Sequence, residues 1–357
     1  MSGFIALVSP TYWRKESAIG GGERYVHELA HALAEHRTVR WITYGDGPTH
    51  REGLAPQLER IVLRRWAPSS KWSPFSPRLG SFLHGAAVVH AFQYYTLPAF
   101  QSLAWAGRHR VPAFCTDLGG GGWTPGYQID QSRWMTAHLP LSNYAARQLP
   151  GMNKSYRVLW GGVDTKKFRP RPEPTHDGSV VFLGRILPHK GIHLLIEAIP
   201  ENVPLWILGA SGDEDYLAEL RRAAKKKMVT FALDASDEQV VDRLQRAALI
   251  VHPTPVDQRG DAGANELLGL APLEGMACGC VPILSNAASL PELIEDGVSG
   301  RLVAPHDSAA LGRAIVDGLT ANSGWREMSQ AATRRVAREF SWQKTAARCV
   351  DAYEVGR

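Results

Sequence analysis

The sequence predicts an α/β protein of two domains, each a doubly wound parallel sheet covered by helices. The 357 residues suit two domains of ordinary size, each long enough to bury its own core. The chain opens with an apolar strand, a glycine loop and a helix, which is the pattern of a βαβ unit. Near residue 160 a proline-rich linker interrupts this pattern, and the alternation of strands and helices then starts again. Sheets of this kind bind ligands beyond the carboxyl ends of their strands.

The composition excludes several classes of protein. With 44% hydrophobic and 21% charged residues, the chain is an ordinary globular sequence without low complexity. The apolar run Phe4–Val8 is too short for a membrane span and lacks a basic leader and a cleavage site, so it predicts a buried first strand. No later segment reaches 18 apolar residues. The four cysteines lack zinc-type spacing, which predicts free thiols in a reducing cytoplasm.

The charge is spread unevenly along the chain. Residues 1–160 carry 17 Lys and Arg against 9 Asp and Glu, a balance of +8. Residues 161–357 carry 23 against 26, a balance of −3, which restores the total of +5. A basic first half suggests an anionic partner, either a phosphorylated acceptor or an acidic membrane surface. A solvated basic face without a partner explains the same numbers.

The first strand is followed by a glycine run and a helix. Apolar residues recur at helical spacing after Gly20-Gly21-Gly22, and Val39–Tyr44 then predicts a second strand. The glycines do not form G-x-G-x-x-G, and no acidic residue closes a clear strand about 20 residues further on, so a nicotinamide site is weakly supported. Close approach of the backbone to a phosphate and a simple tight turn explain the three glycines equally well.

Residues 64–78 combine basic and aromatic side chains with prolines. Such a loop could lie on a membrane interface or close over an acceptor. We favour a folded loop whose tryptophans pack inward. The residues concerned are Arg64, Arg65, Trp66, Lys71, Trp72, Phe75 and Arg78.

Two further apolar runs predict strands in the first half, Ala86–His90 and Val111–Cys115. The second leads into Asp117 and then into four glycines, Gly119–Gly122. Four glycines imply either backbone freedom or close approach of a ligand, and both fit the carboxyl end of a strand.

The second half repeats the alternation after the linker Arg171–Gly178. The acidic run Asp213–Asp215 falls where a helix begins, and the helix dipole favours acidic residues there, so we prefer this explanation to a D-x-D metal site. The tail Ser341–Tyr353 predicts one amphipathic helix, too late in the chain to belong to the second sheet. The expected strands are Val180–Leu183, Leu205–Leu208, Val229–Leu233, Leu249–His252 and Val281–Leu284, with helices ending at Ile199 and covering Tyr216–Lys226 and Asp237–Ala247.

The stretch Asn265–Gly279 places two carboxylates, Glu266 and Glu274, in a segment of apolar and small residues. Pro272 suits the first turn of a helix, so we expect Glu266 in the preceding loop and Glu274 in that first turn. Loop amides and a helix N-terminus together make an anion site, beside which carboxylates bind the hydroxyls of a ligand. A polar loop followed by a core helix with one solvated Glu is an equally good explanation of the spacing.

Five motifs in the same order resemble the retaining glycosyltransferases of family 4, which have the GT-B fold. The resemblance covers nearly the whole chain. It implies two Rossmann-like domains facing across a cleft: an acceptor-side domain over residues 1–160, to which a C-terminal helix within 338–357 returns, and a donor domain over 161–337. The motifs are Gly20–Glu23; Gly161–Asp164 with Phe168 and Pro170; Gly184-Arg185 with Pro188, Lys190 and Gly191; Glu266–Glu274 running on to Gly279; and Glu292 with Asp296-Gly297 and Gly300–Pro305.

The resemblance implies transfer of a sugar from a nucleotide-diphosphate sugar with retention of configuration. Fixed cations held against the leaving diphosphate stabilise its growing charge, so neither a metal nor another cofactor is expected. The implied catalytic residues are Arg185 and Lys190, which would bind the diphosphate, and Glu266, which would hold the donor sugar. The implied substrate-binding residues are Gly22, His90, Asp117, Leu268, Gly269, Leu270 and Glu274, the last through the ribose hydroxyls. The two glutamates are therefore not expected to act as a hydrolase pair.

One departure from the family pattern affects the acceptor side. Many members have a histidine two residues beyond the position that matches His90, where this chain has Phe92. His90 itself ends a strand, and a structural role is the simpler explanation for it. The alternative function is therefore a non-catalytic GT-B protein that binds a nucleotide sugar or supports a partner transferase.

The expected partners follow from the resemblance and the charge. They are a nucleotide-sugar donor and an anionic or lipid-linked acceptor, with peripheral membrane contact through the basic first domain; no nucleic-acid partner is expected. The expected location is the cytoplasm, including the inner face of the membrane. Donor base, sugar and acceptor are not encoded in these motifs.

Overall fold

The computed structural model describes residues 3–12, 21–119, 129–148, 156–173, 175–255, 266–320 and 324–355. The chain divides into two units: Met1–Gly161 together with Trp342–Arg357, and Gly162–Ser341. The boundaries expected from the sequence lie within four residues of these. Three expected features, Gly20, Gly120–Gly122 and Asn265, lie outside the described residues.

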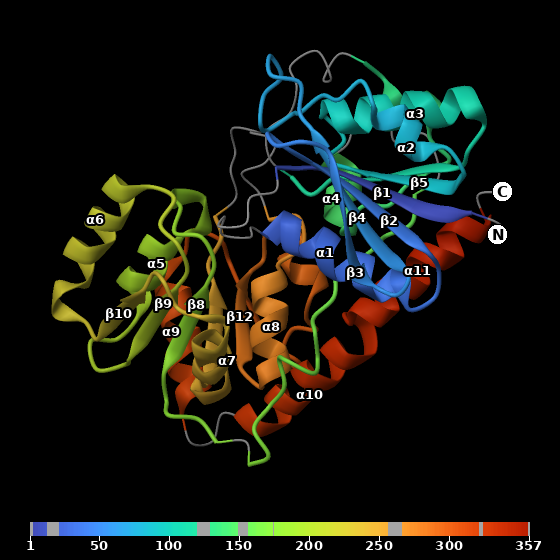
Figure 1. Cartoon of the computed structure of the whole chain (residues 1–357). Coiled ribbons are helices and arrows are strands. Elements are labelled where there is room, and N and C mark those ends of the chain that lie inside the picture. The colour runs from blue at the N-terminus through green and yellow to red at the C-terminus, as the bar shows by residue number, and fades with distance from the viewer. Residues whose placement is uncertain are drawn as a thin grey trace. The chain divides into compact units, whose positions relative to one another are not determined.

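The first unit is built on a seven-stranded sheet in the order β3-β4-β2-β1-β5-β6-β7 (Figure 1). Neighbouring strands are parallel except at the edge, where β3 runs antiparallel to β4. The strands are β1 (Phe4–Tyr12), β2 (Val39–Gly45), β3 (His50–Ala55), β4 (Leu58–Arg64), β5 (Ala86–Phe92), β6 (Ala113–Thr116) and β7 (Ala137–His138). The helices are α1 (Gly21–Ala34), α2 (Leu79–Leu83), α3 (Leu97–His109), α4 (Asn143–Gln148) and α11 (Trp342–Val355).

Helices cover both faces of this sheet (Figure 1). Alternate residues of β1, Ala6 and Val8, join the apolar cluster that α2 and α3 share with the sheet. The other face is covered by α1 and α11, and the rings of Tyr25 and Trp342 meet there edge to face, 5.2 Å between centroids. The predicted C-terminal helix is therefore confirmed, and it packs on the first sheet.

The loop formed by residues 65–78, here called the Trp loop, differs from expectation. Its backbone is held against α3, because the Ser73 hydroxyl accepts a hydrogen bond from the N–H of Leu97 at 2.8 Å. Trp66 and Trp72 are nevertheless 57% and 85% exposed. The expectation that these tryptophans pack inward is wrong. A tryptophan presents both an apolar ring and a polar N–H, so the sequence pattern does not determine which way it turns.

The second unit is built on a six-stranded sheet in the order β10-β9-β8-β11-β12-β13, with all neighbours parallel. Its strands are β8 (Val180–Leu183), β9 (Leu205–Leu208), β10 (Val229–Ala232), β11 (Leu249–His252), β12 (Val281–Ser285) and β13 (Arg301–Val303). Its helices are α5 (Ile192–Ala198), α6 (Glu214–Ala223), α7 (Asp237–Arg246), α8 (Leu270–Cys278), α9 (Ser308–Leu319) and α10 (Trp325–Glu339).

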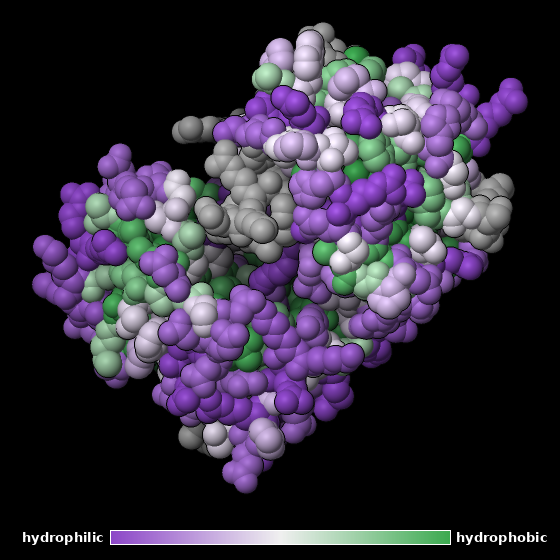
Figure 2. Space-filling view, in the orientation of Figure 1, coloured by the Kyte–Doolittle hydropathy of each residue, from purple (hydrophilic) through white to green (hydrophobic). Residues whose placement is uncertain are grey.

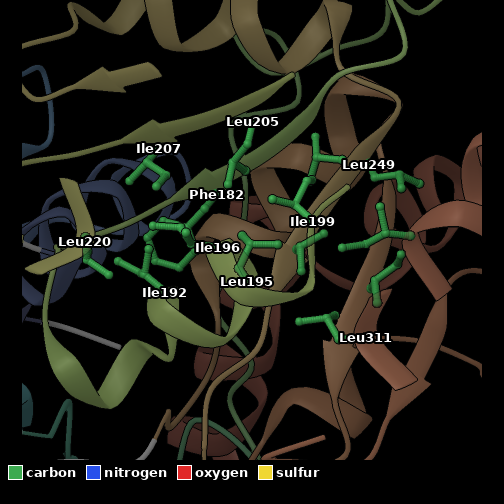
Figure 3. Packing of buried hydrophobic residues seen from close by; sticks show 14 of the residues in the cluster. Phe182, Ile192, Leu195, Ile196, Ile199, Leu205, Ile207, Leu220, Leu249 and Leu311 are labelled. Atoms are coloured by element: carbon green, nitrogen blue, oxygen red, sulfur yellow. The ribbon is translucent and has the colours of Figure 1, made fainter. Parts of the chain in front are cut away.

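The core of this unit joins β8, β9 and β11 to α5, α6 and α9. Phe182, Leu195 and Leu249 lie in the cluster that Figure 3 shows, and all three are fully buried. The runs predicted as strands are strands, since an apolar segment of four residues between glycines and prolines has to be buried on both faces of a parallel sheet.

Helix α8 starts earlier than the sequence suggested. Its first residue is Leu270, so Pro272 is third and Glu274 fifth, which places Glu274 just beyond the expected first turn. Pro272 still lies where a missing N–H breaks no helical hydrogen bond. Gly269, the residue before the helix, has φ of +90°, a conformation that favours glycine.

No helix within the described residues combines the length and the hydropathy needed to cross a bilayer. On the face that Figure 2 shows, hydrophilic residues predominate and hydrophobic groups form small scattered patches. All four cysteines are buried, and all four are free thiols, as predicted.

Candidate functional site

An ion pair stands at the carboxyl end of the second sheet. Lys190 Nζ donates a hydrogen bond to Oε2 of Glu266 at 2.5 Å, across 76 residues of sequence. Only 16% of the lysine side chain and 18% of the glutamate side chain are exposed. A charge removed this far from water needs a partner, and each residue supplies one for the other. The sequence placed both in the donor site but gave no indication that they are in contact.

The turn that carries Lys190 is fixed by a glycine. Residues Pro188–Lys190 form one turn of 3₁₀ helix after β8, and Gly191 follows with φ of +70°. A Cβ atom at Gly191 would lie 2.1 Å from the carbonyl oxygen of Pro253, which is backbone and cannot give way easily. Any side chain at residue 191 would therefore push the Lys190 turn away from the end of β11.

Glu266 is held from two sides. Its backbone carbonyl accepts a hydrogen bond from the Ser289 hydroxyl at 2.8 Å and another from the Ser289 N–H at 3.3 Å. Its carboxylate accepts from the N–H of Gly269, the residue before α8. The loop therefore ends with the carboxylate next to the N-terminus of α8, as the loop-then-helix interpretation predicted.

The pKa of Glu266 reflects two opposing effects. Burial is the largest effect and raises it, because the charged form is poorly solvated, but the charge and hydrogen bond of Lys190 together with the N–H of Gly269 hold the pKa below its usual value. His189, beside this pair, has its pKa lowered by burial and then by the charges of Lys190 and Arg185. At neutral pH Glu266 is therefore an ionised carboxylate.

The other donor-side candidates lie around this pair. Arg185 follows β8, is exposed, and forms no hydrogen bond or ion pair with any of the described residues. Leu268 and Gly269 are buried directly before α8, and Leu270 opens it. Glu274 is buried, with 6% exposed, and its charge contributes to raising the pKa of Cys278 after burial.

The first-domain candidates form a separate group within the first unit. Gly22 is the second residue of α1, and a Cβ there would lie 3.5 Å from Leu118 Cδ1, directly after Asp117. Asp117 follows β6 and accepts a hydrogen bond from the N–H of Tyr94 at 3.2 Å. Burial raises the pKa of Asp117 to about 6, although hydrogen bonds from backbone N–H groups act to lower it. Gly22 thus packs against the side chain of the residue that follows Asp117.

His90 does not fit the substrate-binding role assigned to it. Its side chain is fully buried, Nδ1 contacts the Tyr353 hydroxyl at 2.7 Å, and Nε2 contacts Thr116 Oγ1 at 2.8 Å. Both ring nitrogens are therefore used inside the unit, which supports the structural alternative. Phe92 is also fully buried and stacks on the His90 ring, with centroids 4.4 Å apart.

The acidic run at Asp213 has the structural explanation that the sequence favoured. Asp213 precedes α6, and its carboxylate accepts a hydrogen bond from the N–H of Tyr216 at 3.0 Å. Asp215 lies in the first turn, where the helix dipole favours it. In the part of the chain that the structure describes, no group of three or more His, Cys, Asp or Glu side chains is placed to hold a metal ion.

Two residues of the site were missed from the sequence. Ser289 anchors the backbone of Glu266, and His252 ends β11 next to the segment that packs on Gly191. A serine in a loop carries no signal of such a contact. The histidine at the end of an apolar strand was visible, because a polar side chain at the carboxyl end of a parallel strand is a common ligand position.

Comparisons with known proteins show the family and the fold. The family model described as "Glycosyl transferases group 1" matches residues 163–335, and that described as "Glycosyltransferase Family 4" matches residues 19–167. GDP-mannose:cellobiosyl-diphosphopolyprenol alpha-mannosyltransferase from Komagataeibacter xylinus is 24% identical over 305 residues, 79% of this chain and 74% of that protein.

Solved structures show the same fold. Sucrose-phosphate synthase from Thermosynechococcus elongatus superposes with a TM-score of 0.71 and 22% identity, covering 98% of each chain. HepE from Anabaena, solved with UDP-glucose, gives a TM-score of 0.70 and 16% identity over 99% of this chain and 100% of that one. The two family models together span most of the sequence, in the order of the two units. The chain therefore belongs to the group 1 glycosyltransferases of family 4 and has the GT-B fold.

Proposed function

We propose that this chain transfers a hexosyl group from a nucleotide-diphosphate sugar to an acceptor, with retention of configuration and without a metal. The observation that carries the proposal is the Lys190–Glu266 pair beside the N-terminus of α8, with Arg185 exposed at the end of β8. A diphosphate leaving group gains negative charge as the glycosidic bond breaks. Two fixed cations and free helix N–H groups would stabilise that charge.

Each residue has a proposed role. Lys190 and Arg185 bind the diphosphate, Glu266 accepts hydrogen bonds from hydroxyls of the donor sugar, and Glu274 does so from the ribose. The amides of Leu268, Gly269 and Leu270 face sugar and phosphate. The acceptor hydroxyl attacks carbon 1 on the face that the phosphate leaves, and the departing phosphate takes the hydroxyl proton. No protein base is then needed.

A donor screen tests this proposal. Relatives use different donors by name: the Komagataeibacter enzyme takes GDP-mannose, and HepE was solved with UDP-glucose. A thermal-shift measurement against UDP-, GDP-, ADP- and dTDP-sugars should raise the melting temperature with one nucleotide class, because a ligand that binds only the folded chain stabilises it. The proposal predicts release of the matching nucleoside diphosphate once an acceptor is present. Absence of any shift with every donor would contradict it.

Metal independence gives a separate prediction. Arg185 and Lys190 supply the positive charge that a divalent ion would otherwise provide. We therefore expect about 5 mM EDTA, in roughly thousandfold excess over the enzyme, to leave the transfer rate unchanged. The measurement is the initial rate of nucleoside diphosphate release before and after chelation. A rate that falls in EDTA and returns with Mn²⁺ would show that a metal takes part.

We propose that the acceptor is anionic or lipid-linked and that the enzyme works at the cytoplasmic face of a membrane. The Komagataeibacter relative is named for a diphosphopolyprenol acceptor, which is both. In this chain, the segment between Glu59 and Asp117 contains seven Lys or Arg residues and no Asp or Glu. Five of the basic residues are exposed, and so are both tryptophans of the Trp loop. The basic residues are Arg64, Lys71, Arg78, Arg108 and Arg110.

Basic side chains and exposed tryptophans together suit an anionic bilayer surface, where Trp prefers the headgroup level. Replacing Lys71 and Arg78 by Gln should weaken binding to phosphatidylglycerol-containing vesicles roughly 30-fold, since each cation contributes about 1 kcal/mol. Trp66→Ser with Trp72→Ser should weaken it as well. Vesicle sedimentation measures both effects.

A matched control lies in the second unit. Lys225 and Lys226 are exposed near Met228, itself 56% exposed, and with Arg221 and Arg222 they form a basic cluster that contains no tryptophan. Lys225→Gln with Lys226→Gln should leave vesicle binding unchanged. Equal binding to neutral phosphatidylcholine vesicles, or an equal loss in the control, would contradict membrane contact through the Trp loop.

The second candidate function is a non-catalytic nucleotide-sugar-binding protein. Phe92 favours it, since a buried phenylalanine occupies the position where many relatives have a histidine near the transferred sugar. Binding of a nucleotide sugar without turnover, across a panel of soluble and lipid-linked acceptors, would support this candidate. Turnover would exclude it.

A further inference from the structure

His252, the last residue of β11, is a buried side chain to which the proposed chemistry gives no role. It is 3% exposed, and neither ring nitrogen has a hydrogen-bond partner among the residues that the structure describes. Its ring lies against that of Phe182, with centroids 4.9 Å apart and planes at 30°. Burying both nitrogens of an imidazole without partners is unfavourable, so the presence of a histidine here needs an explanation.

The position of His252 relates it to the Lys190–Glu266 pair. The next residue, Pro253, has its carbonyl oxygen packed on Gly191, which directly follows Lys190. The charges of Glu266 and Lys190 both act on His252. The imidazole therefore lies beside the ion pair without being bonded to either member.

His252 is neutral at neutral pH. Burial lowers its pKa to about 3; the negative charge of Glu266 opposes that shift and the positive charge of Lys190 adds to it. A neutral imidazole offers one N–H donor and one acceptor. The other titratable groups of the cluster are Arg185, a permanent cation, and His189, whose pKa is lowered chiefly by burial.

Donor binding changes the partners that are available to the Glu266 carboxylate. In the proposed function Lys190 must turn its ammonium to the diphosphate, a stronger anion than a single carboxylate. Glu266 then keeps the N–H of Gly269 but loses the hydrogen bond and charge of Lys190. A carboxylate with 18% of its side chain exposed would then tend to take up a proton, and a protonated Glu266 would hold the sugar hydroxyls less well.

We propose that His252 is a positioning residue: its ring N–H donates a hydrogen bond to the Glu266 carboxylate when Lys190 engages the diphosphate. This inference rests on the proposed function. It explains why neither ring nitrogen has a partner among the described residues, and why Glu266 can remain ionised and oriented toward the donor sugar after losing its lysine. No proton is transferred, and no residue changes its covalent state.

Three substitutions separate this role from simple packing. His252→Phe keeps the ring and its contact with Phe182 but has no N–H, and it should lower kcat roughly 10- to 100-fold, the value of a hydrogen bond to a charged group. The acid limb of the kcat–pH profile should move to higher pH, because Glu266 in the donor complex then protonates more readily. His252→Gln and His252→Asn retain an N–H donor near the positions of Nε2 and Nδ1, and one of them should restore most of kcat.

Wild-type kcat and an unmoved acid limb in His252→Phe would overturn the inference. Equal loss in the Phe, Gln and Asn variants would also overturn it, since only a packing role treats all three alike. Melting temperatures of the three variants, measured with and without nucleoside diphosphate, separate loss of folding from loss of positioning.

A readout that does not need turnover comes from nitrogen NMR of histidine-labelled protein. The His252 signals are those missing in His252→Phe. Adding UDP-glucose or GDP-mannose, whichever binds, should shift one ring nitrogen, and Lys190→Ala should show that shift without any donor. Unchanged His252 signals in Lys190→Ala would refute the inference. Absence of transfer by the wild-type chain would contradict only the proposed function, and the Lys190→Ala spectrum would still decide the role of His252.

Discussion

Lys190→Ala is expected to lower the rate of sugar transfer by roughly 10²- to 10³-fold, the range found when one fixed donor to a developing anion is removed. The diphosphate carries its largest charge in the transition state, so losing the ammonium should reduce kcat more than it weakens donor binding. The removal also leaves Glu266 without its cation in a site where burial already opposes the charged form. Initial rates at several donor concentrations measure the change in kcat and KM separately.

Two further variants sharpen this prediction. Glu266→Ala should abolish transfer as well, because it removes the proposed contact with the sugar hydroxyls. Lys225→Ala removes an exposed lysine of the same unit and should leave the rate unchanged. Wild-type turnover in both Lys190→Ala and Glu266→Ala would show that the donor site has been assigned to the wrong residues.

Gly191→Ala is expected to destabilise the second unit by roughly 2–5 kcal/mol. A non-glycine residue at φ of +70° costs about 1–2 kcal/mol, and forcing a Cβ against backbone costs about 1–3 kcal/mol more. The added methyl group would lie 2.1 Å from the Pro253 carbonyl oxygen, so the Lys190 turn and the end of β11 must separate. Urea unfolding measures the stability, and transfer should fall together with it because the same turn carries Lys190.

Gly178 provides a matched control for this effect. It has φ of +75°, nearly the same as Gly191, but nothing lies within 4 Å of the position that a Cβ would take. Gly178→Ala should therefore cost only about 1–2 kcal/mol, the part due to backbone conformation. Similar losses in the two variants would mean that the contact between Gly191 and Pro253 contributes nothing to stability.

The short apolar strands of the second unit were predictable, and the edge strand β3 of the first unit was not. Val180–Leu183, Leu205–Leu208 and Leu249–His252 are continuous apolar runs, and their observed bounds are the predicted ones. β3 reads His-Arg-Glu-Gly-Leu-Ala and has no apolar alternation, because it is an edge strand paired only with β4. Its side chains form ion pairs with that neighbour, such as Arg51 with Glu59 at 2.9 Å, and this long-range charge pairing leaves no periodic signal.

The candidate site was predictable as a set of residues but not as a set of contacts. Motif order brought Lys190 and Glu266 into one donor site, and only the folded chain shows that they neutralise each other. The distinctive feature of His252 is that neither ring nitrogen has a partner among the described residues, which depends on the side chains packed around the ring. His90 shows the opposite case, since its neighbours Tyr353 and Thr116 use both nitrogens that the sequence left available for a substrate.

The C-terminal helix has a consequence for how the protein is made. Trp342–Arg357 belong to the first unit, although the whole second unit, Gly162–Ser341, is synthesised before them. Until they leave the ribosome, Tyr25 lacks its ring contact with Trp342, and His90 lacks the hydroxyl of Tyr353. The second unit can therefore complete its core during synthesis before the first, which must wait for Trp342–Arg357. Translation thus finishes the later half of the fold first and leaves the amino-terminal unit incomplete until this helix has been made.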